Sequence, residues 1–276
     1  MAPSILSRKR TYAELSQSPE VSRFKNFDDI TIWDLNKASS IVVRVEVKFP
    51  VEIRGYVQRF ILVDTTGSKI EAIVRDTNVS RFNMLLTEGR TYTMHHVFHN
   101  IRSSYDCTLD HRTVVEPSIV AIQFPPYPKN IMPFTEVYQC PDKTFVDIAG
   151  IVVRWCETER VGTYPNQKLY REVILMDERK NLLVVGIWSN LLARYAISLP
   201  SAAADYQVIL GTMLRNNFKH GCYETSDHTT FAFNPAHHAT GELQALRRSL
   251  VNGSFDLTFV KRFMERRWEY LATVVK

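Results

Sequence analysis

The sequence lacks the features that would place it in a membrane or in a fibre. Its 276 residues include only 10 glycines and 12 prolines, which excludes a collagen-like or low-complexity chain. No run approaches the ~20 consecutive apolar residues of a membrane-spanning helix. The first residues, MAPSILSRKR, lack the apolar core of a secretory signal. Hydrophobic residues make up 45% and charged residues 23% of the chain, an ordinary globular composition. We therefore expect a soluble intracellular protein.

Cysteine is scarce, and no local pattern of metal ligands occurs. The four cysteines lie far apart in the sequence: Cys107, Cys140, Cys156 and Cys222. Without a C-x-x-C pair, the chain cannot build a zinc ribbon or a thioredoxin-like redox motif locally. Of the histidines, His95, His96, His99, His237 and His238 are candidate ligands, but the first three lie in the strand-like run TYTMHHVF. We predict free thiols, structural or groove-lining histidines, and no metal or other cofactor.

Enzyme motifs are missing as well. The sequence contains no G-x-S-x-G elbow, P-loop, H-E-x-x-H or G-x-G-x-x-G motif. Its acidic residues fall at predicted turns, as do Asp64 and Asp177, or on the solvent faces of predicted strands, as do Glu46 and Glu172. They do not form the clustered pairs that acid–base catalysis needs. We predict a protein that is not an enzyme.

The sequence does contain a repeated β pattern. Residues 41–49, IVVRVEVKF, alternate apolar and charged side chains, and RFILVDTTGSKIEAIV contains two further strands joined by a turn. In VSRFNMLLTEG, Val79, Phe82 and Leu86 share one helical face before Gly89 ends the helix. The order of strand, hairpin, short helix, strand and strand is typical of a five-stranded Greek-key barrel.

This pattern occurs twice, at a separation of 113 residues. The equivalent pairs are Leu62 and Leu175, Asp64 and Asp177, Ile70 and Leu183, Ala72 and Val185, Val74 and Ile187, Val79 and Leu192, Phe82 and Tyr195, and Leu86 and Leu199. One separation that holds through strand, turn and helix indicates two tandem copies of one barrel.

The repeat and the composition together predict a domain organisation. The predicted segments are a flexible basic tail over 1–25, a first barrel over 26–124, a Pro-rich linker over 125–133, a second barrel over 134–240 and a helical tail over 241–276. The tail contains Arg8, Lys9 and Arg10, a cluster typical of a nuclear-import signal, although a solvated tail is the alternative. On this basis we expect the protein in the nucleus.

Aromatic residues at two positions of the repeat point to nucleic acid. Small barrels bind single strands in a groove across strands 2 and 3, where bases stack on aromatic rings. Trp188 ends the third strand of the second barrel, and alternation turns it away from Ile187. Phe218 lies in the polar hairpin RNNFKHG, and Tyr105 lies 113 residues earlier in RSSYD. At the position of Trp188 the first barrel has Arg75. The alternatives are packing within the barrel for Trp188 and docking of a protein partner for the other two rings.

Basic residues accompany these aromatics, in a chain of net charge +5 and pI near 9.0. The residues predicted to contact a phosphate backbone are Arg44, Lys48, Arg54, Arg59 and Arg75 in the first barrel and Arg154, Lys168, Arg171, Arg215 and Lys219 in the second. Each alone is better explained as a solvated surface charge. Only their combination with the aromatics favours nucleic acid.

The C-terminal tail has a helical pattern after Gly253, with Ser254 as a helix N-cap. One apolar stripe at spacings of three and four contains Leu257, Val260, Met264, Trp268 and Leu271. The basic residues Lys261, Arg262, Arg266 and Arg267 lie largely off this stripe. Three interpretations stay open: packing against the second barrel, docking of partner subunits, and extension of a DNA path.

The motifs resemble a known family. WDLNKASSIVVRVEVK, FILVDTTGSKIEAIVRD and VSRFNMLLTEGRTYTM resemble the first DNA-binding barrel of the replication protein A large subunit. FVDIAGIVVRW, REVILMDERKNLLVVGIWSN and YQVILGTMLRNNF resemble its next barrel, so the resemblance covers roughly residues 27 to 235. Short two-barrel relatives of this kind are familiar from plants as replication factor A-like proteins. This chain lacks the zinc-ribbon barrel of the family's large subunit.

The resemblance implies a fold and a set of site residues. The fold is dominated by β structure, with two tandem five-stranded OB-fold barrels, a short helix between strands 3 and 4 of each, and a C-terminal helix. In the family each barrel stacks bases on one aromatic at the end of strand 3 and one after strand 4. Trp188 and Phe218 match both places in the second barrel, whereas the first barrel has Tyr105 and the departure Arg75.

The resemblance also implies a function. We expect a non-catalytic, largely sequence-independent single-stranded DNA-binding protein that acts in DNA replication, repair, recombination or telomere maintenance. Other replication protein A-like subunits are expected as partners through the C-terminal helix. Two alternatives stay open: a protein-interaction scaffold derived from such a subunit, and an RNA-binding module.

Overall fold

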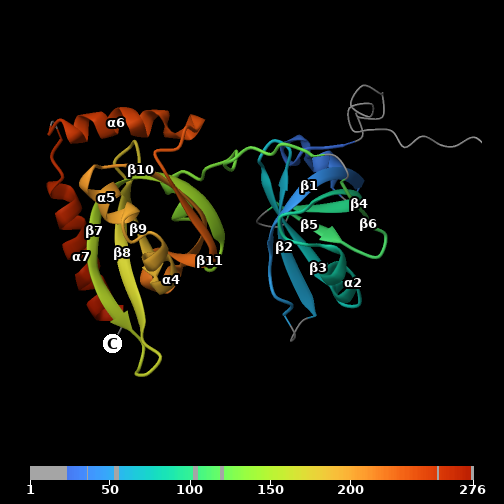
Figure 1. Cartoon of the computed structure of the whole chain (residues 1–276), viewed down its shortest axis with the longest axis horizontal. Helices are drawn as coiled ribbons and strands as arrows, with labels where there is room; N and C mark the ends of the chain where they lie inside the picture. Colours follow the sequence, from blue (N-terminus) through green and yellow to red (C-terminus); the bar gives the residue numbers. More distant parts are fainter. Residues whose placement is uncertain are drawn as a thin grey trace, which may run out of the picture. The chain divides into compact units, whose positions relative to one another are not determined.

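The structure is a computed structural model that describes residues 24–35, 37–52, 56–101, 105–118, 121–253 and 255–274. The side chains of residues 101, 105 and 274 also lie outside this description. So do the predicted import cluster at residues 8–10, Arg54 and the predicted N-cap Ser254. Contacts divide the chain into two units between Asn130 and Ile131, and each unit is described by itself (Figure 1).

The first unit is a closed β-barrel. Its strands are β1 (Ala38–Lys48), β2 (Val57–Asp64), β3 (Lys69–Arg75), β4 (Thr91–Ile101) and β5 (Tyr105–Leu109). They pair in the order β1-β2-β3-β5-β4, and β4 pairs again with β1 and closes the barrel. The β3–β5 pair is parallel and the others are antiparallel. Strand β6 (Val114–Pro117) adds to β4 outside the ring, and helix α2 (Asn78–Leu85) connects β3 to β4.

The second unit repeats this topology (Figure 1). Its strands are β7 (Phe145–Val161), β8 (Lys168–Met176), β9 (Leu182–Trp188), β10 (Val208–Asn217) and β11 (Cys222–Phe233), and they form a closed barrel in the order β7-β8-β9-β11-β10. Two short helices, α4 (Ser189–Arg194) and α5 (Ser198–Ala204), stand where the first unit has α2. Helix α3 (Phe134–Val137) precedes the barrel. The predicted fold class, two tandem OB-fold barrels, is confirmed.

Alternation along the strands separates core from surface. In β3, Ile70, Ala72 and Val74 are buried, whereas the residues between them are partly exposed. The predicted helical face is also buried, with Phe82 fully enclosed in the core of the first barrel. Replacing such a phenylalanine with alanine typically costs about 3–5 kcal/mol, because the enclosing side chains cannot close the cavity.

Aspartates fix the equivalent hairpin turns. The Asp64 carboxylate accepts hydrogen bonds from the backbone N–H of Thr66 and of Ser68, at 2.9 and 3.0 Å. The Asp177 carboxylate accepts from the N–H of Asn181 at 2.7 Å in the second barrel. Both aspartates are buried and are satisfied by turn donors, as expected for residues that stabilise turns locally.

A threonine closes an irregularity in the fourth strand of each barrel. His96 in β4 and Met213 in β10 have φ of 56° and 55°, next to breaks in the pairing register. The Thr113 hydroxyl donates to the His96 carbonyl at 3.1 Å, and the Thr229 hydroxyl donates to the Met213 carbonyl at 2.8 Å. We call this arrangement the strand-4 clasp. In each barrel the hydroxyl satisfies a carbonyl at the irregularity, part-buried at His96 and buried at Met213.

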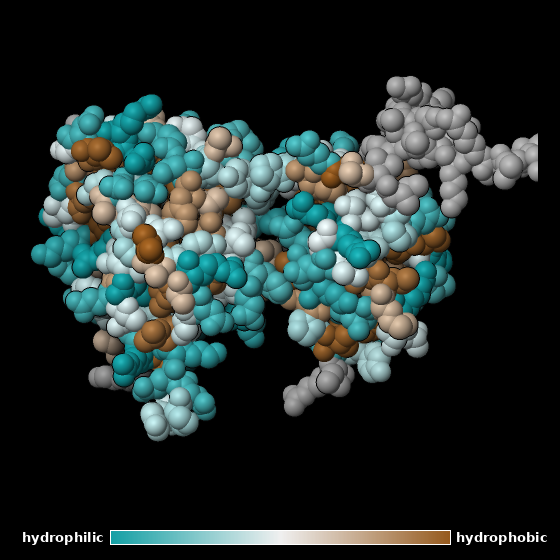
Figure 2. All heavy atoms as spheres, in the orientation of Figure 1, coloured by the Kyte–Doolittle hydropathy of each residue, from teal (hydrophilic) through white to brown (hydrophobic). Residues whose placement is uncertain are grey.

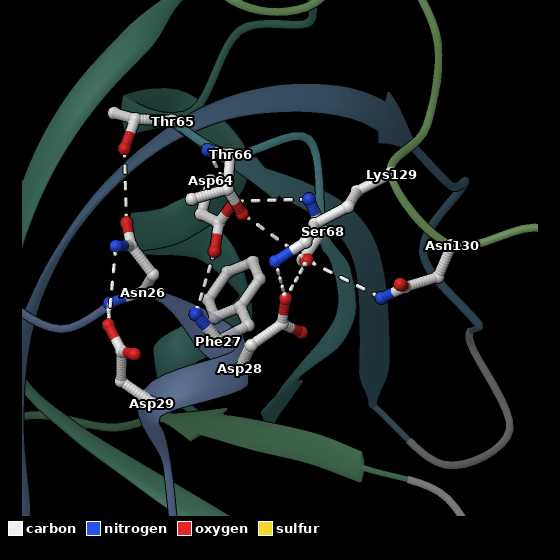
Figure 3. A network of polar contacts seen from close by, with 10 residues as sticks. All are labelled: Asn26, Phe27, Asp28, Asp29, Asp64, Thr65, Thr66, Ser68, Lys129 and Asn130. Carbon is white, nitrogen blue, oxygen red and sulfur yellow. Dashed lines mark hydrogen bonds and ion pairs between the residues drawn. The ribbon is translucent and has the colours of Figure 1, made fainter. Parts of the chain in front are cut away.

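The predicted Pro-rich linker, residues 125–133, begins packed on the first barrel. The Lys129 N–H donates to the Gly67 carbonyl at 3.0 Å, and its ammonium pairs with Asp28 (Figure 3). Gly67 has a φ of 92°, and a Cβ there would lie 3.2 Å from the Lys129 nitrogen. A glycine is therefore required both by the turn and by the approach of this segment.

Two helices follow the second barrel, where the sequence predicts one after Gly253. They are α6 (Gly241–Val251) and α7 (Thr258–Val274). Val260 and Met264 of α7 are buried against Ile174 and Met176 on the outer face of the barrel, so two of the five residues of the predicted stripe are buried within the unit. Leu257 packs partly against the same cluster, whereas Trp268 is 50% exposed and Leu271 is half-buried. Of the packing and docking interpretations, the first accounts for Val260 and Met264. No helix in the described ranges is long and apolar enough to span a membrane.

Candidate nucleic-acid interface

The outer faces of β2–β3 and β8–β9 correspond to the groove that the sequence predicts. In β9, Val185 and Ile187 point into the barrel core. Gly186 and Trp188 therefore lie on the outer face, because alternate residues of a strand face opposite sides. Trp188 is half-buried there, as alternation from Ile187 predicts.

Trp188 rests against a second aromatic ring. It pairs in register with Tyr170 of β8, and the two ring centroids lie 4.8 Å apart with an interplanar angle of 55°. The backbone N–H of Trp188 donates to the Thr225 hydroxyl of β11 at 3.1 Å. The Tyr170 ring thus supports one side of the indole, and the bond to β11 holds the backbone that carries it. Such a ring can offer its remaining surface to a base.

Tyr170 occupies space that exists only because residue 186 is glycine. A Cβ built on Gly186 would lie 2.5 Å from Tyr170 Cε2 and 2.7 Å from Cζ, and it would also collide with the hydroxyl oxygen. The hydroxyl donates to Glu172 Oε1 at 3.2 Å, and burial raises its pKa. Sequence reasoning missed Tyr170. The available signal was Gly186, a glycine inside a strand, which marks a close approach.

Phe218 lies on an ordered turn. The 3-10 turn η4 (Phe218–His220) follows β10 and leaves the Phe218 side chain 71% exposed. The Phe218 N–H donates to Asp142 Oδ1 at 3.0 Å, and the turn ends at Gly221 with a φ of 55°. Lys219 is exposed beside it. An exposed phenylalanine on a hydrogen-bonded turn is a second ring that a base or a partner could contact.

Tyr105 does not share the strand position of Phe218. Ala72 of β3 pairs with Cys107 of β5, whereas Val185 of β9 pairs with Tyr223 of β11. Ala72 and Val185 are equivalent at a separation of 113, but 223 minus 107 is 116. The prediction that Tyr105 and Phe218 occupy one loop position is therefore wrong by three residues, because the second barrel holds extra residues before its fifth strand. The Tyr105 side chain lies outside the described residues.

The predicted basic residues of the second barrel do not form one track. Arg154 lies 5.9 Å from the ring centroid of Trp268, and Arg171 lies 4.5 Å from that of Trp155. Arg215 pairs with Glu224 at 3.8 Å. Lys168 and Lys219 are exposed, the first at the start of β8 and two residues before Tyr170. These two lysines are the members of the set most available to phosphate.

The predicted basic residues on the face of the first barrel are paired with carboxylates. Arg59 contacts Glu52 and Glu71 at 3.4 and 3.2 Å, and Arg44 contacts Glu46 at 2.9 Å. These exposed pairs add at most about 1 kcal/mol each to stability, but each carboxylate also opposes an approaching phosphate. The structure therefore offers fewer free cations on this face than the sequence suggests.

Lys48 and Arg75 differ in their surroundings. The Lys48 ammonium donates to the carbonyls of Asn83 and Leu86, at 2.6 and 3.0 Å, where helix α2 ends. It therefore stabilises unpaired carbonyls at a helix C-terminus, a structural role. Arg75 is exposed at the end of β3 and is the first-barrel counterpart of Trp188.

Helix α7 covers part of the outer face of the second barrel. Arg267 Nη2 donates to Glu172 Oε1 at 2.6 Å and its Nε donates to Oε2 at 3.2 Å. Its Nη1 donates to the carbonyls of His220 and Gly221 at 2.9 and 3.0 Å. Burial lowers the pKa of Arg267, but the Glu172 carboxylate outweighs this and raises it overall. Glu172 was predicted on a solvent face and Arg267 away from the apolar stripe of the helix. Instead, the two side chains pair between α7 and the barrel. A stripe of apolar residues alone cannot reveal a buried ion pair.

The histidines of β4 have structural surroundings. His99 is buried, with its Nε2 2.6 Å from the Ser39 hydroxyl, and His95 Nδ1 lies 2.8 Å from the Ser40 hydroxyl. Within the described residues, no group of three or more His, Cys, Asp or Glu is placed to hold a metal ion. All four cysteines are free, and Cys107 and Cys222 are buried.

Comparison with known proteins agrees with the predicted resemblance, which is confirmed. The chain is similar to a 70 kDa DNA-binding subunit of replication protein A from Arabidopsis thaliana, with 24% identity over 160 residues. The match covers 54% of this chain and 26% of that protein, so the chain spans about a quarter of its relative's length. Residues 132–224 match a family model described as a domain of unknown function, DUF8448.

Three solved structures also match parts of the chain at low identity. A replication protein A heterotrimer bound to single-stranded DNA matches at 17% identity and a TM-score of 0.43, covering 83% of this chain and 55% of that one. DNA-binding domain A of replication protein A from S. cerevisiae matches at 20% identity and a TM-score of 0.28, covering 36% and 96%. Pot1pC of Schizosaccharomyces pombe bound to single-stranded DNA matches at 14% identity and a TM-score of 0.27, covering 34% and 85%.

Proposed function

We propose that this protein binds single-stranded DNA, without catalysis and with little sequence preference, through the outer face of its second barrel. The observation that carries the proposal is the pair of presented rings: Trp188, supported by Tyr170, and Phe218 on its hydrogen-bonded turn. The name of the relative, a DNA-binding subunit, supports the same ligand. We further propose a nuclear role in DNA replication, repair, recombination or telomere maintenance.

Stacking supplies the part of the affinity that the two rings can test. Each base that stacks on an aromatic side chain contributes roughly 1–3 kcal/mol, and the interaction tolerates any base. Replacing both Trp188 and Phe218 with alanine then removes roughly 2–6 kcal/mol, which is about a 30-fold loss of affinity at the lower limit. This estimate decides how large an effect the test must resolve.

Phosphate contacts supply a further part. Lys168 and Lys219 are exposed on the second barrel, and among the described residues no carboxylate forms an ion pair with them. Two phosphate contacts on a single strand correspond to a slope of about −1.4 in a plot of log K against log salt concentration. A much steeper slope would require cations beyond these two.

The test measures binding of a labelled oligothymidylate to the full chain by fluorescence anisotropy. We expect Trp188→Ala combined with Phe218→Ala to weaken binding at least about 30-fold while the thermal unfolding midpoint stays within a few degrees. Trp33→Ala is the matched control, since Trp33 is exposed in the first unit and outside the proposed face. An affinity unchanged by the double substitution would refute the stacking assignment.

A protein-interaction scaffold is the second candidate. It is favoured by the carboxylates that pair with Arg44 and Arg59 on the first barrel, because they oppose a phosphate. On the face shown in Figure 2, hydrophilic residues cover most of both units and hydrophobic ones form only small groups, so that face offers no large apolar surface to a partner. If α7 docks a replication protein A-like subunit, it does so with Trp268 and Leu271, because Val260 is already buried. This candidate predicts a stable complex with a partner and no oligonucleotide binding by the full chain.

RNA is the other polymer that stacking would accept. Aromatic stacking does not read the sugar, so the two rings alone do not select DNA over RNA. Competition between DNA and RNA oligomers of matched sequence measures which of the two the protein prefers. We expect DNA to compete at least as well as RNA.

A further inference from the structure

The C-terminal helix holds the turn that presents Phe218. Arg267 reaches from α7 to the consecutive carbonyls of His220 and Gly221, directly after Phe218 and Lys219. The same guanidinium is bound by both oxygens of Glu172 on β8. One side chain thus joins three elements: the helix, the strand and the turn.

The geometry of this contact requires arginine and a left-handed residue after the turn. Glu172 engages Nε and Nη2 of the guanidinium, which leaves Nη1 to donate to both carbonyls. A lysine ammonium has no such planar fork and cannot satisfy the carboxylate and two carbonyls in the same way. Gly221, at a φ of 55°, lets its carbonyl and that of His220 face the same donor.

The Arg267 side chain is buried in a well-packed part of the second unit. It is only 8% exposed, and Met264 and Val260, one and two turns earlier in α7, are buried in the cluster that covers the barrel. The remaining hydrogen bonds of the turn are either local to the hairpin, such as that from the His220 N–H to Asn217 Oδ1 at 3.3 Å, or exposed, as is that from the Phe218 N–H to Asp142. Arg267 is thus a side chain that joins the turn directly to β8.

We propose that Arg267 is a positioning residue for Phe218, so that helix α7 is a built-in part of the nucleic-acid interface of the second barrel. The proposal rests on the function proposed above. Arg267 itself is buried and does not contact the ligand. It fixes the distance between the turn with Phe218 and the strand pair that carries Tyr170 and Trp188, and a strand of nucleic acid then meets both rings without first ordering the turn.

The experiment compares Arg267→Gln with Arg266→Gln in the full chain. Arg266 is the exposed neighbour in the same helix, so it has the same charge change without the contacts to the turn. We expect Arg267→Gln to weaken oligothymidylate binding by at least about threefold, up to the loss caused by Phe218→Ala. We expect faster amide hydrogen exchange at residues 218–222. Arg266→Gln should change neither readout.

A double-substitution cycle separates positioning from general weakening. If Arg267 acts through Phe218, Arg267→Gln adds no further loss of affinity in a Phe218→Ala background. Additive losses, or unchanged exchange at residues 218–222, would overturn the proposal. If Arg267→Gln impairs folding, Glu172→Gln keeps the arginine and weakens its anchor, and the same two readouts apply with smaller expected changes.

The two proposals can fail separately. An unchanged affinity of Phe218→Ala would refute stacking by that ring. The hydrogen-exchange comparison of Arg267→Gln and Arg266→Gln would still decide whether Arg267 holds the turn.

Discussion

Gly186→Ala tests the packing beneath Trp188 most directly. The added Cβ would fall 2.5 Å from Tyr170 Cε2 and 2.7 Å from Cζ, so the tyrosine ring must move. That ring cannot shift freely, because its hydroxyl is bonded to Glu172 and its face contacts Trp188. We therefore expect loss of stability and displacement of Trp188 together.

The magnitude follows from two opposing effects. Overpacking of a filled site costs about 1–3 kcal/mol. Removing a glycine from a strand returns about 0.5–1 kcal/mol, since the unfolded chain loses conformational freedom. The net expectation is a destabilisation of roughly 1–2 kcal/mol, which lowers the unfolding midpoint by about 3–8 °C for a unit of this size.

Calorimetry of the full chain measures this shift, and two variants make the result specific. Gly241→Ala is the matched control, because a Cβ there meets nothing within 4 Å and the residue begins α6. Tyr170→Val should rescue Gly186→Ala, since the first barrel has Val57 and Ile73 at the equivalent places. We expect a favourable coupling of about 1–2 kcal/mol between the two substitutions.

The same variants bear on the ligand. If Tyr170 supports Trp188, Gly186→Ala should also weaken oligonucleotide binding several-fold. Two results would show that the Tyr170 ring is not packed tightly against β9. One is a Gly186→Ala protein as stable as Gly241→Ala; the other is that the stability effects of Gly186→Ala and Tyr170→Val are additive.

Two further predictions concern the barrels themselves. Burial lowers the pKa of His99 to about 4, below its ordinary 6.5, so the unfolded chain binds more protons between these values. The free energy of unfolding of the first unit should therefore be independent of His99 above pH 6.5 and should fall by up to about 3 kcal/mol as the pH falls to 4. Urea unfolding against pH should show this slope, and His99→Gln should flatten it; an equal slope in both proteins would contradict the assignment. Thr229→Val should destabilise the second unit by about 1–3 kcal/mol, because it removes the acceptor of the Ser226 N–H and one of the two hydroxyls, Thr229 and Ser226, that donate to the Met213 carbonyl. Calorimetry should show little change for the exposed Thr273→Val, and an equal effect of both substitutions would count against the clasp.

The sequence was sufficient to predict the barrels because their cores follow local rules. Alternation in the strands and the helical face of Val79, Phe82 and Leu86 depend on neighbours in the chain, and all three side chains are buried as expected. The separation of 113 residues was correct through the second and third strands. In the helical segment the second barrel has two helices and buries Leu191, where the repeat pairs Val79 with Leu192. The separation also failed at Tyr105, because loops can gain residues without changing strand order.

The parts of the candidate site that sequence reasoning missed depend on long-range packing. Glu172 and Arg267 lie 95 residues apart, and charged residues are expected on a surface unless a partner is known. Tyr170 looks like one more residue of an amphipathic strand, although Gly186 marks where its ring lies. Such pairings become visible only when the outer face of the barrel is assembled.

The strand-4 clasp also has a consequence for how the two barrels diverged. Thr113 and Thr229 perform the same bond in both copies, whereas the outer faces differ in size and charge, with Arg59 where the second barrel has Glu172. A gene duplication that preserves barrel closure leaves the two faces free to specialise independently. The faces are not interchangeable residue by residue, because arginine at position 172 would oppose the buried Arg267. We therefore expect that the second face can be exchanged for the first without loss of the fold only when Arg267 is replaced with it.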